Sequence, residues 1–139
     1  MATHILDMDY SDQYDFVLIG LSCVEREHRL AWAINKTMGW NLAREKDLEV
    51  VMKSGLSSHA RFSFRHPEDQ TVFTLLANRS DSSVLLPEWG QFDYLLKIQE
   101  DSHESEEVIF GKIRRVPFVL AALELPSEKV RSIQNLISS

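Results

Sequence analysis

LPEWGQFDYLLKI, residues 86–98, joins a Pro-led turn to a strand and contains several chemically capable side chains. Pro87 fixes its own φ and biases Leu86 toward an extended conformation, so we expect the chain to turn between Glu88 and Gly90. After the turn, every second residue is apolar: Phe92, Tyr94, Leu96 and Ile98. This period of two predicts a strand with one firmly buried face.

The same stretch contains the first candidate binding site. Its members are Glu88, Trp89, Asp93 and Tyr94, to which Arg29 is added from a predicted helix. Two carboxylates, a phenol and an indole beside a turn suit a small polar ligand, because loops at strand ends often carry ligands. A structural role is the favoured interpretation. In that role Glu88 accepts backbone N–H groups in the turn, and Asp93 is held by a basic side chain or by backbone donors of the same turn.

The nonapeptide LPEWGQFDY resembles the signature of the small bacterial family named for its IPExxxVDY motif. The direct matches are Pro87, Glu88, Asp93 and Tyr94, whereas Leu86 replaces the Ile and Phe92 replaces the Val. The runs HRLAWAIN (28–35) and REKDL (44–48) also resemble the family's pattern, so the likeness spans most of the chain. The resemblance implies no activity, because none is assigned to the family. Genes of its members tend to lie near those of fatty-acid synthesis and ribonuclease III, which implies a housekeeping context.

Length and composition indicate one globular domain. The 139 residues are enough to bury a core, and we expect a single domain over 1–139 that begins with an acidic arm at 1–14. Hydrophobic residues make up 44% and charged residues 26%, which is typical of folded proteins. The net charge of −6 lacks the basic footprint of a nucleic-acid binder, so no direct nucleic-acid partner is expected.

Cysteine content and the first residues predict the compartment. Cys23 is the single cysteine, so an internal disulfide cannot form and a reducing compartment is favoured. The start, MATHILDMDYSDQYD, has no basic segment followed by an apolar one, and no apolar run reaches membrane-spanning length. We therefore expect a cytoplasmic protein without a membrane partner.

The amino-terminal half begins with a buried strand and a helix. FVLIGL, residues 16–21, is a continuous apolar run too short for a helix, which predicts a central strand buried on both faces. Ser22 and Glu25 have capping-box spacing, so a helix is expected to start there and to end at Gly39. Over residues 40–51 we expect a short edge strand that runs into a turn or partial helix.

The remaining elements follow from local pattern in the same way. We expect a loop at 55–58, a hairpin of 60–65 with 72–77, and a polar connection at 78–83. Beyond an acidic loop at 100–107, we expect a helix from Ser105 to Arg115, an interior strand at 118–123 and a terminal helix from Ser127.

This order of elements predicts an α+β fold in two layers. We expect a mostly antiparallel sheet with helices on one face, as in an elaborated βαββαβ, ferredoxin-like unit. The alternative is a doubly wound α/β sheet, which the hairpin in the middle of the chain disfavours.

The first predicted helix carries the second candidate site. Its core-facing stripe is expected to be Leu30, Ala33, Ile34, Thr37 and Met38. Trp32 falls on the polar side, between Arg29 and Lys36, although so large an apolar side chain gains by burial. Either the arm or a nearby strand covers Trp32, or Arg29, Trp32 and Lys36 form a surface that meets another subunit.

No catalytic or metal site emerges from the remaining residues. Glu25 and His28 have the Glu-x-x-His spacing of carboxylate di-metal sites, but no second such pair is present. The five histidines lack metal-ligand spacing, and there is no phosphate loop, nucleophile elbow or dinucleotide fingerprint. Cys23 is interpreted as buried filler rather than as a nucleophile. We expect no metal and no cofactor.

The sequence therefore favours a non-catalytic interaction or regulatory domain. Its partner would be another protein or a second copy of the chain. The alternative is a small-molecule-binding protein or enzyme with its site in LPEWGQFDY.

Overall fold

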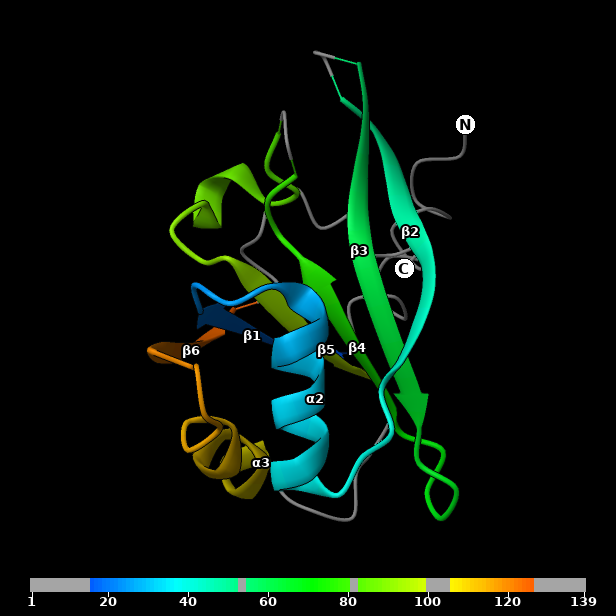
Figure 1. Cartoon of the computed structure of the whole chain (residues 1–139), viewed down its shortest axis with the longest axis vertical. Helices are drawn as coiled ribbons and strands as arrows, with labels where there is room; N and C mark the ends of the chain where they lie inside the picture. Colours follow the sequence, from blue (N-terminus) through cyan, green and yellow to red (C-terminus); the bar gives the residue numbers. More distant parts are fainter. Residues whose placement is uncertain (1–15, 53–54, 81–82, 100–105, 127–139) are drawn as a thin grey trace, which may run out of the picture.

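A single antiparallel sheet with two helices on one face makes up the part of the chain that the structure describes (Figure 1). The structure is a computed structural model and describes residues 16–52, 55–80, 83–99 and 106–126. Its strands are β1 (Phe16–Ser22), β2 (Ala43–Met52), β3 (Gly55–Arg65), β4 (Val72–Ala77), β5 (Tyr94–Gln99) and β6 (Ala121–Leu125). The helices are α2 (Glu27–Met38), α3 (Glu106–Ile113) and the short 3₁₀ helix η1 (Pro87–Trp89).

The sheet has the strand order β2-β3-β4-β5-β1-β6, and every pair of neighbouring strands that is described runs antiparallel. The predicted α+β class is confirmed. The ferredoxin-like elaboration is not confirmed, and the doubly wound alternative is wrong because its sheet would be parallel. β1 lies between β5 and β6, so the prediction of an inner strand at 16–21 is confirmed.

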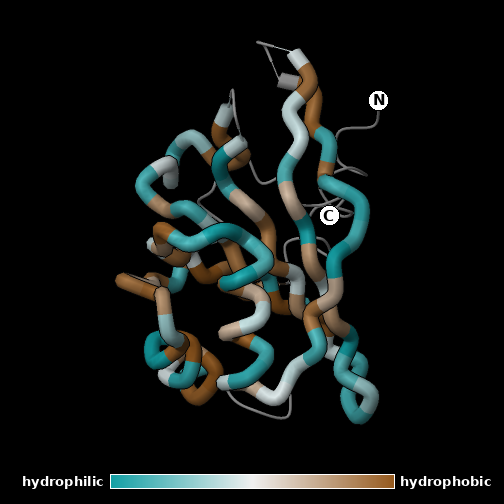
Figure 2. The backbone as a smooth tube through the Cα atoms, in the orientation of Figure 1, coloured by the Kyte–Doolittle hydropathy of each residue, from teal (hydrophilic) through white to brown (hydrophobic). Residues whose placement is uncertain are grey.

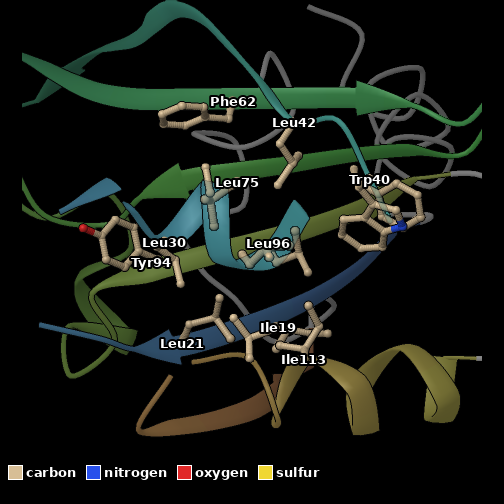
Figure 3. Close-up of a cluster of buried hydrophobic side chains, with 14 of the residues drawn as sticks. Ile19, Leu21, Leu30, Trp40, Leu42, Phe62, Leu75, Tyr94, Leu96 and Ile113 are labelled. Atoms are coloured by element: carbon tan, nitrogen blue, oxygen red, sulfur yellow. The ribbon is translucent and has the colours of Figure 1, made fainter. Parts of the chain in front are cut away.

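Two clusters of buried side chains lie on opposite faces of the sheet. On the helix side, Leu30 of α2 and Ile113 of α3 meet Leu96 of the sheet (Figure 3). On the other face, Leu18 and Leu95 pack with Leu85 and with two residues of LPEWGQFDY (86–94), which we call the motif segment: Leu86 and Phe92. Inner strands therefore need apolar side chains on both faces, as in β1. Figure 2 shows the contrast with the outer strand β2, whose first half is hydrophilic.

The first helix begins later than its sequence signal predicted. α2 starts at Glu27, and the capping position is occupied by Arg26 without a side-chain hydrogen bond. Ser22 cannot cap it because Ser22 is the last residue of β1, paired with Ala121. The predicted end is confirmed: Gly39 has φ 72° and donates its N–H to the Asn35 carbonyl.

The core-facing stripe of α2 differs from the predicted one at two positions. Leu30, Ala33 and Ile34 are buried as expected, but Thr37 is exposed and Ala31 is buried. Met38 is partly buried against the same cluster.

β2 and β3 form a longer hairpin than local pattern indicated. β2 is a ten-residue edge strand with an irregularity between Glu45 and Leu48, so the predicted turn or partial helix is wrong. The expected loop at 55–58 is also wrong, because these residues open β3. Pairing along the whole hairpin outweighs the low strand propensity of the charged cluster, which an edge strand tolerates on its solvated side. The predicted pairing of 60–65 with 72–77 is confirmed.

Three predictions for the second half of the chain are wrong in part. The strand predicted after the motif turn does not include Phe92: β5 begins at Tyr94, and both of its faces are buried, not one. The apolar run 118–123 is not an interior strand: β6 covers 121–125 and lies at the end of the strand order. α3 ends at Ile113 rather than Arg115.

The expected arm at 1–14, the helix-capping Ser105 and the terminal helix from Ser127 lie outside the described residues. Among the described helices, none has the length and apolarity needed to cross a membrane.

Candidate functional site

The motif segment is held by a buried asparagine at the end of β4. Asn78 donates its side-chain amide to the carbonyls of Trp89 and Phe92, at 3.1 and 2.9 Å. Its side-chain oxygen accepts the N–H of Leu86 at 2.8 Å. The backbone N–H of Asn78 donates to the Asp93 carbonyl, at 2.9 Å. One side chain therefore fixes both ends of the turn, and buried polar groups satisfied in this way make a turn rigid.

Phe92 enters the core on the side of the sheet away from the helices. Its ring lies over Gly20 of β1, so closely that a Cβ on Gly20 would be 2.7 Å from the ring. Phe92 is thus separated from Tyr94, which is buried on the helix side. The glycine is required here for the close approach of an aromatic ring to the strand backbone.

Asp93 occupies the bend that leads into β5. Its Oδ2 accepts the backbone N–H of Cys23 at 2.9 Å, and its Oδ1 lies 3.4 Å from Nε of Arg79. Its own N–H donates to the carbonyl of Leu21. The expected basic partner is thus present. The backbone donor comes from the segment after β1, and not from the turn around Glu88 as the sequence had suggested.

Tyr94 and Cys23 lie beside this carboxylate, and both are held in their neutral forms. The Tyr94 hydroxyl donates to the Glu25 carbonyl at 2.6 Å, and burial raises the pKa of the phenol. Burial likewise raises the pKa of the Cys23 thiol, which points at the same carbonyl across 3.9 Å. A neutral thiol and a neutral phenol bound to a carbonyl are poor nucleophiles and poor bases. This geometry agrees with the interpretation of Cys23 as filler.

An open hollow of about 400 Å³ lies between the β1–α2 connection and the ends of β4 and β5. Asp93 and Tyr94 line it, together with Arg79. Glu88 and Trp89 do not: both lie in η1, where Trp89 packs against the cluster on the far face of the sheet. Arg29 is absent from the lining as well. The structure therefore brings together two of the five residues of the first candidate site.

One polar atom in the motif is unusual. The indole N–H of Trp89 is buried and is the one buried side-chain donor or acceptor among the described residues that has no hydrogen-bond partner. No described pocket is lined by Trp89. An unsatisfied donor costs stability, but without a cavity it does not define a ligand site.

The second candidate site forms a continuous strip along α2. Trp32 is 58% exposed, and Nζ of Lys36 lies 4.9 Å from the centre of its ring. One turn earlier, Arg29 pairs with Glu25 at 3.1 Å and places its guanidinium 5.3 Å from the ring centre of Phe118. All three predicted residues thus share one solvent-facing surface, which we call the Trp32 surface. Of the two covers considered for Trp32, no described strand provides one, and the arm at 1–14 lies outside the described residues.

The carboxylate and imidazole considered as metal ligands do not share a helix face. Glu25 precedes α2, whereas His28 lies in its first turn. In the described part of the chain, no group of three or more acidic, histidine or cysteine side chains is placed to hold a metal ion.

The sequence alone did not identify the residues that hold the motif through contacts with distant parts of the chain. The sequence places Asn78 and Arg79 in a polar connection, where asparagine and arginine are common without any role in holding a distant turn. His59 was one of five dispersed histidines, yet it is fully buried, with Nδ1 2.8 Å from the Ala77 carbonyl and Nε2 2.6 Å from the Ser57 hydroxyl. Burial lowers the pKa of His59, so the neutral ring donates to the carbonyl and accepts from the serine. No local pattern signals these partners.

Comparison with known proteins adds no relative: no family model, no curated protein and no solved structure matches this chain.

Proposed function

We propose that this chain is a non-catalytic interaction domain and that the Trp32 surface is where it meets a protein partner. The observation that carries the proposal is the 58% exposure of Trp32. Tryptophan contributes more than most residues when it is buried at an interface, and it is enriched, with arginine, among the residues that dominate binding energy.

The neighbours of Trp32 support the same function. Lys36 lies over the indole ring, and Arg29 continues the strip as a second exposed cation. Cations beside an aromatic ring attract an acidic or carbonyl-rich partner while the ring supplies apolar contact area. The chemistry near the motif supports a non-catalytic role, because the thiol of Cys23 and the phenol of Tyr94 are held neutral.

We further propose that the chain belongs to the IPExxxVDY family and works in the bacterial cytoplasm. The support is the match at Pro87, Glu88, Asp93 and Tyr94, and the presence of one unpaired cysteine. A ligand site built from the motif is the weaker candidate, since Glu88 and Trp89 lie away from the hollow that Asp93 lines.

The test compares affinity capture from native lysate by the wild-type chain, Trp32→Ala and the control Val51→Ala. Val51 is also exposed but lies on β2, away from α2. A partner retained by wild type and by Val51→Ala, but lost from Trp32→Ala, supports the proposal. The isolated partner should then shift the fluorescence of the wild-type protein and leave that of Trp32→Phe unchanged. Equal capture by all three chains, or no specific capture at all, would reject it.

A further inference from the structure

β6 presents an apolar strand at an open edge of the sheet. It pairs with β1 on one side, and no described strand pairs with the other. Leu120 is 71% exposed and Leu123 is 49% exposed, and Ala121 between them is exposed as well. Figure 2 shows that much of this edge is hydrophobic, and its place at the side of the sheet can be followed in Figure 1. An exposed apolar edge strand is a template for pairing with another chain.

At the opposite edge of the same sheet, the first half of β2 is protected against such pairing. β2 carries five charged side chains, Arg44, Glu45, Lys46, Asp47 and Glu49, and its register is interrupted between Glu45 and Leu48. Charges and a bulge are the usual means by which an edge strand avoids edge-to-edge contact. β6 has neither: its register with β1 is regular and Glu124 is its single charged residue. The first half of the β2 edge is thus protected by charge and by a bulge, whereas β6 lacks both.

We propose that β6 pairs antiparallel with β6 of a second copy of this chain, which joins the two six-stranded sheets into one. A two-fold axis that gives complete overlap of the five-residue strand must pass through its middle residue, Leu123. In that register Leu123 faces its own equivalent across the axis, and Ala121 faces Leu125 of the other copy. These apolar residues lie on the same face of the sheet, because side chains alternate along a strand.

The charge pattern of β6 favours a second copy of this chain as the strand that pairs with its open edge. Complete overlap places Glu124 opposite Ala122 of the other copy, so the strand's single charge never faces itself. Like charges placed directly opposite would destabilise the pair, and this register avoids them. The edge is therefore self-complementary in both apolarity and charge, which is what a two-fold interface requires. A strand from an unrelated protein is the competing occupant, and the test below distinguishes it.

This dimer goes beyond the proposed function and does not depend on it. The Trp32 surface lies on a helix that packs on the face of the sheet, whereas the pairing uses the sheet edge. Trp32→Ala should therefore leave the dimer intact. Because a five-residue pairing is a small interface, the dimer should dissociate in a measurable range, and sedimentation velocity from about 1 µM to about 1 mM covers it.

The decisive variants are Leu123→Lys and Leu123→Glu, with Val51→Lys on β2 as the matched control. Either charge at 123 would face itself across the axis, so each variant alone should raise the dimer dissociation constant at least about tenfold. An equimolar mixture of the two should recover dimers, because opposite charges then face each other. Val51→Lys should dimerise like wild type. Circular dichroism of the single variants verifies that the monomers are folded.

Recovery in the mixture identifies the two-fold register, since neither misfolding nor a different interface would produce it. A wild-type chain that stays monomeric throughout the concentration range would overturn the proposal, as would dimers that tolerate Leu123→Lys. If the chain stayed monomeric and β6 bound a different protein, the edge would pair with a strand of that protein, and the proposed dimer would be rejected.

Discussion

The carboxylate of Asp93 accepts a hydrogen bond from the backbone N–H of Cys23, 70 residues earlier in the chain, over 2.9 Å. This contact ties the bend before β5 to the end of β1. Arg79, at 3.4 Å, lies near the other carboxylate oxygen. Asp93, which matches the IPExxxVDY pattern, thus fastens neighbouring strands where the sheet meets the β1–α2 connection.

Replacing Asp93 by Ala should lower the free energy of unfolding by about 2 kcal/mol, and the melting temperature by several degrees, because the Cys23 N–H loses its acceptor. Asp93→Asn keeps an acceptor oxygen and loses only the partly exposed ion pair, so it should cost about 1 kcal/mol or less. Calorimetric melting of the two variants measures the difference. If Asp93→Ala melted like wild type while losing a partner or ligand, the motif would be a functional site instead.

Gly20→Ala should destabilise the protein by about 1–3 kcal/mol, because the new Cβ would collide with the Phe92 ring. Adding Phe92→Val, the residue type of the family motif, removes the ring and should make Gly20→Ala much less costly. A double-mutant cycle by urea denaturation tests this coupling. Strictly additive effects would show that the two residues are not in contact.

Gly111→Ala supplies the matched control for the glycine substitution. A Cβ on Gly111 meets nothing within 4 Å, and the residue lies inside α3. Alanine should therefore stabilise the protein by about 0.5–1 kcal/mol through helix propensity.

Asn78→Asp should be among the most destabilising single substitutions, by about 3 kcal/mol or more. The variant keeps the acceptor for Leu86 but loses both amide donors, and it turns a carboxylate toward the carbonyls of Trp89 and Phe92 in a buried site. Equilibrium unfolding measures the loss. Asn35→Asp is the control: Asn35 also brackets one residue, Leu42, but is only partly buried, so its cost should be clearly smaller. Equal losses of stability in Asn78→Asp and Asn35→Asp would contradict the role of Asn78 in holding the turn.

Lys97 should make stability increase with pH in alkaline solution. Burial, with a smaller contribution from the charge of Arg61, lowers the pKa of Lys97 from 10.5 to about 8. Between these values the unfolded chain binds more protons than the folded one, so the cost of burying the charge is fully present below pH 8 and is relieved toward pH 10.5. Relative to Lys97→Met, the wild type should gain about 3 kcal/mol at most over this range.

Urea denaturation of wild type and Lys97→Met at several pH values between 7 and 10.5 measures this gain. Lys46→Met, at an exposed position of β2, is the control for the loss of a lysine. Parallel stability curves for wild type and Lys97→Met would contradict the shift.

Cys23 should resist alkylation in the folded protein. Its side chain is buried, and burial and the negative charge of Asp93 both raise the pKa of the thiol, so little thiolate is exposed to a reagent. Iodoacetamide at pH 8 should label Cys23 at a rate set by unfolding, and Asp93→Ala should accelerate labelling by destabilising the fold. Rapid labelling of the native wild type would instead indicate an accessible, reactive thiol.

Local sequence determined the features that depend on neighbouring residues. The apolar run at 16–21 predicted an inner strand, Gly39 predicted the end of α2, and Pro87 predicted the turn before β5. Each of these signals acts within a few residues: continuous apolarity requires two buried faces, glycine accepts a positive φ, and proline restricts the backbone. The candidate residues Arg29, Trp32 and Lys36 were likewise found from helical spacing alone.

Tertiary structure decided everything that depends on which strands are neighbours. Ser22 had the spacing of a helix cap but was taken up by pairing with Ala121, and the run at 118–123 looked interior but ends at the sheet edge. Asn78 became a clamp only because the turn at Pro87 folds back onto β4. Hydrogen-bond partners and burial are set by long-range pairing, whose free energy exceeds the local preference of any single residue. The open edge at β6 is therefore a property of the folded chain, whereas helical spacing already placed Trp32 on the polar side of its helix.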